Sequence, residues 1–208
     1  HHEVFNDLNV IPKFCFNCFK IQIEPKNVLE LFKLFLIFDE LKLSKNNTRK
    51  CLVELRPNIS GIYKGLIYCS GIEEAEEILK NITPTLKKFI DNNIMIKIKR
   101  GCSEFAEKYK EYKEINKDSP NFMKYENEWK EKEKTFDINE IKNKKRKKKF
   151  KDSISGLTIS DVLVMNNWLN YAKSINDLTY KDISEDMFYS DYISKTISAQ
   201  LEKRKMNF

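Results

Sequence analysis

The 208-residue chain has few residues that turn a backbone and few that carry out catalysis. Five glycines and five prolines favour long helices and strands over tight turns. The only histidines, His1 and His2, open the chain without a methionine, so we expect a piece of a longer protein or a tag remnant. The sequence has neither a glycine-rich phosphate loop nor a G-x-S-x-G motif, and gives no positive indication of an enzyme.

Long apolar runs are also missing. The most apolar stretch, residues 28–38, is interrupted by Glu30 and Lys33 and is shorter than the roughly 20 residues of a membrane-spanning helix. We therefore expect no transmembrane segment. Five cysteines are an odd number and no secretory signal precedes them, so we expect free thiols in a reducing, intracellular compartment.

The net charge of +7 comes from one segment, the basic arm of residues 142–151. It carries eight positive charges and no negative one, so the rest of the chain has a net charge of −1. The arm can bind phosphates of a nucleic acid or another polyanion, serve as a nuclear import signal in a eukaryote, or contact anionic lipid. Its central cations are Lys144, Lys145, Arg146, Lys147, Lys148 and Lys149.

Apolar periodicity predicts six elements in the first hundred residues. Residues 14–23 alternate as a half-buried strand, and residues 26–43 carry a helical stripe. Residues 48–71 form a hairpin, residues 71–90 a second helix, and residues 93–102 a strand with its isoleucines inward. This order predicts an α+β fold, the ferredoxin-like split βαβ (β-α-β-β-α-β) arrangement, with a four-stranded antiparallel sheet, both helices on one face and a C-terminal helical extension.

Two details of this fold follow from single residues. Pro84 is expected to break the second helix into two pieces. If the hairpin folds near Ser60, Cys51 lies opposite Cys69, and both face the helices as packing residues. The even-numbered residues of both strands then face the other side of the sheet.

We divide the chain into three parts: a ferredoxin-like domain (1–102), a polar wrap with the basic arm (103–155) and a C-terminal helical segment (156–208). In the last part, Ser160 is expected to cap a helix whose apolar stripe includes Val162.

Three cysteines are candidates for a metal site. In the expected strand order 4-1-3-2, with strands one and three parallel, Cys15 and Cys18 open the first strand and Cys102 follows the fourth, beside it. With His2 or a group from another chain, they predict a thiolate site for zinc or an iron–sulfur cluster. The alternative is buried free thiols, because cysteine is often interior and a second close pair is absent. A redox pair is less favoured, because such a motif belongs at a strand-to-helix junction.

Cations and one aromatic ring share the sheet face away from the two helices. Single-stranded nucleic acid needs such a surface, with cations for phosphates and a ring on which a base stacks. The alternative is that the C-terminal helices cover this face. The candidate nucleic-acid-binding residues are Lys20, Arg56, Lys64, Tyr68, Lys97 and Lys99.

Residues 63–82 resemble the third strand and second helix of RNA-recognition motifs. Lys64, Gly65 and Tyr68 match the signature of that strand, whereas Leu66 occupies the position of its first stacking aromatic. The resemblance implies RNA binding on the sheet face.

We therefore predict a non-enzymatic protein that binds nucleic acid, RNA above all, or a subunit of a ribonucleoprotein. If the cell is eukaryotic, we expect the protein in the nucleus. The alternatives are a zinc or iron–sulfur domain of a larger enzyme or complex, and a scaffold that docks another protein.

Overall fold

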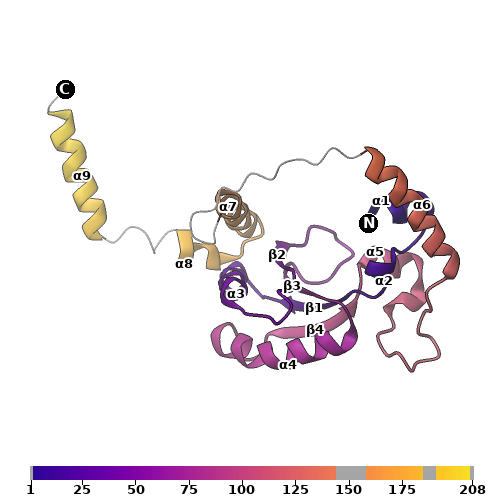
Figure 1. Cartoon of the computed structure of the whole chain (residues 1–208). Helices are drawn as coiled ribbons and strands as arrows, with labels where there is room; N and C mark the ends of the chain where they lie inside the picture. Colours follow the sequence, from indigo (N-terminus) through magenta and orange to yellow (C-terminus); the bar gives the residue numbers. More distant parts are fainter. Residues whose placement is uncertain (1, 144–157, 185–190, 207–208) are drawn as a thin grey trace.

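A four-stranded antiparallel sheet lies at the centre of the computed structural model, which describes residues 2–143, 158–184 and 191–206 (Figure 1). The strands are β1 (Phe19–Glu24), β2 (Arg49–Val53), β3 (Tyr63–Cys69) and β4 (Met95–Arg100), in the order β2-β3-β1-β4. Helices α3 (Val28–Glu40) and α4 (Ile72–Phe89) pack on one face. The predicted α+β class is confirmed.

Alternate residues of each strand form the core under these helices. Ile21, Ile23 and Ile67 are fully buried there, against Leu34 of α3 and Leu86 of α4. The isoleucines of β4 point to the same side, as their alternation predicts. The intervening residues of the strands therefore share the opposite face.

The predicted hairpin register is wrong by four residues. Cys51 lies opposite Gly65, not Cys69, because the two strands pair symmetrically about Asn58 rather than about Ser60. The last backbone hydrogen bond before the loop of the hairpin joins the Glu54 amide to the Ile62 carbonyl over 2.7 Å. A shift by an even number leaves every side chain on its predicted face. The expectation that strands one and three are parallel is also wrong, since β1 and β3 are antiparallel.

The N-terminal residues form helices rather than the start of β1. Helix α1 spans His2–Leu8 and α2 spans Lys13–Phe16, so the strand predicted from residue 14 begins only at Phe19. The Phe16 amide donates to the Pro12 carbonyl over 2.8 Å, which closes one helical turn. Two phenylalanines two residues apart fit such a turn as well as a strand.

A second apolar cluster joins this N-terminal segment to the chain after β4. It contains residues from α1, α2, α5 (Ser103–Lys108), the 3-10 helix η1 (Lys110–Lys113) and α6 (Asn127–Asn143). The guanidinium of Arg100 lies within 4.6 Å of the ring centroids of Phe16 and Tyr112 and donates to the Phe16 carbonyl. The division of the chain at residues 102 and 155 stays a prediction.

Helix α4 is continuous through Pro84, so the predicted break is wrong. Ile78 and Ile82 before the proline and Leu86 after it are all buried against the sheet. Burial of this one stripe outweighs the loss of a single backbone hydrogen bond.

The C-terminal segment packs on α3. Helix α7 (Ile159–Ser174) is capped by Thr158 in a capping box rather than by Ser160, and places Trp168 against Phe32 and Phe35, with ring centroids 5.8 Å apart in each pair. Val162, predicted in the apolar stripe, is 56% exposed.

After α7 come the 3-10 helix η2 (Leu178–Tyr180), α8 (Lys181–Ser184) and α9 (Asp191–Lys205). Just before η2, Asp177 accepts hydrogen bonds of 2.7 Å from the Val28 amide at the start of α3 and from the Tyr63 hydroxyl. A residue far along the chain therefore completes the N-terminus of α3.

Candidate functional site

The polar face of the sheet, opposite α3 and α4, is largely covered rather than open. Lys20 is 5% exposed and Lys64 is 3% exposed, and Gln22 and Leu66 are also buried. The register places Lys20 beside both Tyr68 and Lys99 across neighbouring strands. The structure therefore brings the predicted residues together, but as the lining of an enclosed space instead of a flat platform.

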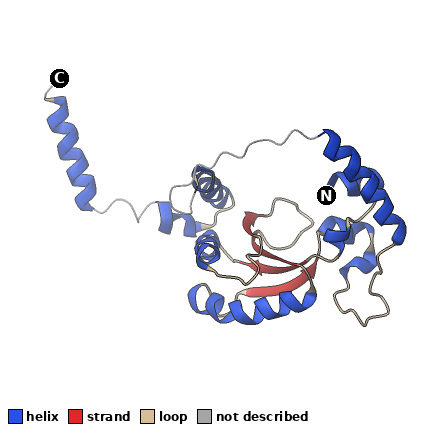
Figure 2. Cartoon of the chain, viewed as in Figure 1, coloured by secondary structure: helices blue, strands red, loops and turns tan. Residues whose placement is uncertain are grey.

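The cover consists of the loop between β2 and β3 together with α5. Figure 2 shows this loop arching over the sheet. Arg56 in the loop donates to Glu54 over 2.8 Å and forms an ion pair with Glu104 of α5. The C-terminal helices, the predicted alternative cover, pack on α3 through Trp168 instead.

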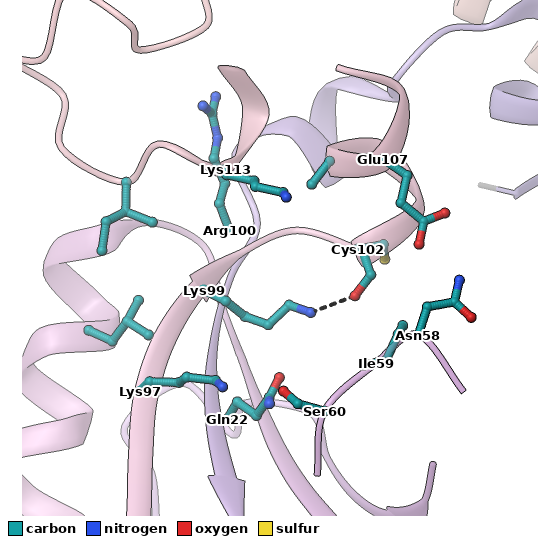
Figure 3. Close-up of a pocket in the computed structure, with 14 residues that line it drawn as sticks. Gln22, Asn58, Ile59, Ser60, Lys97, Lys99, Arg100, Cys102, Glu107 and Lys113 are labelled. Atoms are coloured by element: carbon teal, nitrogen blue, oxygen red, sulfur yellow. Dashed lines mark hydrogen bonds between the residues drawn. The ribbon is translucent and has the colours of Figure 1, made fainter. Parts of the chain in front are cut away.

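Two adjoining cavities lie between the cover and the sheet, and together we call them the lysine pocket. The outer cavity has a volume of about 530 Å³, and Figure 3 shows Lys97 extending from β4 toward Gln22 and Ser60, and Lys99 extending toward Cys102. The inner cavity has a volume of about 150 Å³. Gln22 and Lys99 are among the residues that line both.

Positive charge dominates the inner cavity, where five cations face two carboxylates, Glu54 and Glu104. The cations are Lys20, Lys50, Arg56, Lys64 and Lys99. Glu54 accepts hydrogen bonds from Arg56 and from Lys64, whose ammonium lies 3.3 Å away. The Arg56 hydrogen bond, with help from Lys64, lowers the pKa of Glu54 to about 2. These two cations are therefore neutralised within the protein.

Lys20 and Lys99 have a sulfur and a hydroxyl as their hydrogen-bond partners. The Lys20 ammonium donates to the Cys102 sulfur over 3.2 Å and lies 4.9 Å from the centroid of the Tyr68 ring. The Lys99 ammonium donates to the Ser103 hydroxyl over 2.9 Å, the dashed line in Figure 3. In the part of the chain that the structure describes, neither forms an ion pair with a carboxylate. Burial, followed by repulsion from Lys20 and Lys64, lowers the pKa of Lys99.

A buried charge is costly unless an opposite charge compensates it. Two neighbouring ammonium groups that form no ion pair with a described carboxylate are therefore the arrangement expected of a site that binds an anion. Lys97, at the rim, already pairs with Glu24 over 2.6 Å.

Sequence reasoning missed Lys50 and Ser103. Lys50 lies two residues before Leu52 on the same face of β2, so continued alternation would have identified it. No sequence pattern indicates Ser103 as a pocket residue, because its place in the pocket depends on how α5 folds back over the sheet. The basic-arm residues Lys144 to Lys149 lie outside the described residues.

The three candidate metal ligands lie at one end of the sheet. Cys15 belongs to α2, Cys18 directly precedes β1, and Cys102 follows β4, where the adjacent Gly101 amide donates to the Cys18 carbonyl over 2.8 Å. Burial raises the pKa of Cys15 to about 11 and also raises that of Cys18, so both are neutral thiols at pH 7. Within residues 2–143, 158–184 and 191–206, no three His, Cys, Asp or Glu side chains are grouped as metal ligands.

Comparison of the chain with protein-family models, curated proteins and solved structures finds no match. In the described ranges, no helix combines the length and the apolar character that a membrane span requires.

Proposed function

We propose that the protein binds single-stranded RNA without catalysing a reaction, and that the lysine pocket holds a phosphate of the strand. The observation that carries this proposal is the pair of ammonium groups of Lys20 and Lys99, which lack a carboxylate partner within the described residues. The Tyr68 ring, beside Lys20, offers a nearby surface for a base.

Two features of the sequence favour a nucleic acid over a small anion. The basic arm supplies eight positive charges that a polyanion can neutralise. Residues 63–82 resemble RNA-recognition motifs, whose fold is ferredoxin-like. We propose that fold here too, supported by the order β2-β3-β1-β4 with α3 between β1 and β2 and α4 between β3 and β4.

The test measures binding of a fluorescent single-stranded RNA pool by anisotropy at two salt concentrations. The double variant Lys20→Met/Lys99→Met should bind at least tenfold more weakly than the natural sequence, while Lys80→Met, an exposed lysine on α4, should not change affinity. Replacing the six central cations of the arm with glutamine should lower the salt slope by about 0.7 per lost phosphate contact. Equal binding by all variants at both salt concentrations would refute the proposal.

The zinc or iron–sulfur site stays a prediction. The geometry favours it less than RNA binding, because Cys102 already accepts a hydrogen bond from Lys20. Metal analysis and an absorption spectrum of anaerobically purified protein check it. Stoichiometric metal that is lost in Cys15→Ser would favour this alternative over RNA binding.

An intracellular location, nuclear in a eukaryote, also stays a proposal. It is supported by five free cysteines and by the basic arm. Fluorescence microscopy of the tagged chain with and without the arm tests it.

A further inference from the structure

The geometry of the lysine pocket points to a terminal phosphate as its ligand: we infer that the protein binds the phosphorylated end of an RNA strand rather than its interior. This inference rests on the proposed RNA binding and specifies which part of the strand enters the pocket. It follows from the closure of the inner cavity, from its charge and from the unequal size of the two cavities.

The inner cavity is partly closed, by the sheet on one side and by a loop on the other. The sheet forms its floor, where Lys20 and Lys64 are almost fully buried. Its roof is the β2–β3 loop, tied at one end to the sheet by the Glu54–Lys64 ion pair and to α5 by the Arg56–Glu104 ion pair. The cover leaves the inner cavity a volume of only about 150 Å³, which suits the phosphate at a chain end better than a nucleotide within a strand.

The charge of the cavity matches a phosphate monoester better than a diester. A terminal phosphate carries about −1.5 to −2 charges at pH 7, whereas each internal phosphate carries one. Lys20 and Lys99 supply two positive charges that form no ion pair with a described carboxylate, and their side chains converge on Cys102 and Ser103 at the start of α5. A dianion would therefore compensate both ammonium groups at once.

The two cavities divide the ligand by size. The inner one, of about 150 Å³, suits a phosphate group, and the outer one, of about 530 Å³, lies in the range of roughly 300–1,000 Å³ that holds small organic ligands. Gln22 and Lys99 line both cavities, so a ligand can extend from one to the other. The terminal nucleoside would then occupy the outer cavity beside Asn58 and Ser60 of the loop (Figure 3).

The test compares three internally labelled RNA decamers of one sequence, with a 5′-phosphate, with a 3′-phosphate, or with hydroxyls at both ends. One phosphorylated probe should bind the full chain at least tenfold more tightly than the hydroxyl probe. Lys20→Met and Lys99→Met should each lower the affinity for the preferred phosphorylated probe to the affinity that the natural sequence has for the hydroxyl probe. Lys80→Met should keep the preference.

A second measurement uses a nucleoside monophosphate and the matching nucleoside as competitors against the unmodified chain, which avoids dependence on the folding of any variant. Only the monophosphate should displace the preferred probe. Equal binding of all three decamers overturns the end-recognition inference and leaves RNA binding intact. Binding of the monophosphate without binding of any decamer overturns RNA binding and retains the phosphate site, and binding of none of these ligands overturns both.

Discussion

Replacing Lys20 with methionine should make the ligand-free protein more stable. The Lys20 side chain is almost fully buried, and no described carboxylate compensates its charge. Methionine has a similar length and no charge, so it can fill the same space without the desolvation penalty. A lysine kept for a ligand should lower stability in the absence of that ligand.

The magnitude follows from three contributions. Relief of the effective desolvation penalty of one buried ion is worth several kcal/mol, here taken as about 3 kcal/mol. Loss of the contact with the Tyr68 ring, at 4.9 Å, costs about 1 kcal/mol. Loss of the hydrogen bond to Cys102 costs about 1 kcal/mol more. The net gain is about 1 kcal/mol, or a rise in Tm of about 2–4 °C for a chain of this size.

The assay is urea unfolding followed by circular dichroism in a buffer without phosphate. The matched control is Lys64→Met, on the same sheet face, which should lower the free energy of unfolding instead of raising it. It removes one partner of buried Glu54, which keeps Arg56, and should cost about 2 kcal/mol. A loss of more than about 1 kcal/mol in Lys20→Met would show that Lys20 is a satisfied structural residue and would refute the reasoning.

Three further outcomes are expected. Hydrogen bonds from an arginine and a lysine hold the pKa of Glu54 at about 2, below its unfolded value of 4.5. The contribution of Glu54 to stability is therefore complete above pH 4.5 and is lost as pH falls toward 2. Urea midpoints should decrease from pH 7 to pH 4 and pH 3, and constant midpoints would contradict this. Gly101→Ala should cost about 2 kcal/mol, because φ is +52° and a Cβ would collide with Tyr112, whereas Gly71→Ala, in extended backbone, should stay within about 0.5 kcal/mol in the same assay. Burial raises the pKa of the Cys69 thiol to about 12, so a thiol reagent at pH 8 should label it far more slowly in native protein than in urea, and equal rates would show that it is accessible.

The parts of the fold that the sequence predicts correctly depend on local periodicity. The alternation in β4 assigns Ile96 to the core and Lys97 to the opposite face, where the structure has them. The hairpin error of four residues left these assignments intact, because side chains alternate with a period of two. The sequence therefore assigns Lys20, Lys64 and Lys99 of the lysine pocket to the correct face.

The enclosure of that face could not be predicted in the same way. It depends on the pairing of Arg56 with Glu104, residues 48 positions apart, which no periodic pattern encodes. The ion pairs that compensate Glu54, and the lack of a described carboxylate partner for Lys20, likewise depend on the tertiary structure. Sequence composition shows where cations are frequent, whereas only geometry shows which of them still lack a counter-charge.

The contact of Asp177 with the start of α3 has a consequence for synthesis of the chain. The Val28 amide leaves the ribosome 149 residues before the carboxylate that accepts its hydrogen bond. Until then, α3 exposes the side chain of Phe32 and the nascent sheet exposes that of Tyr63, both of which α7 later shields. Translation stopped early should therefore yield polypeptides that need chaperones to stay dispersed, because the last quarter of the chain covers a surface made in the first third.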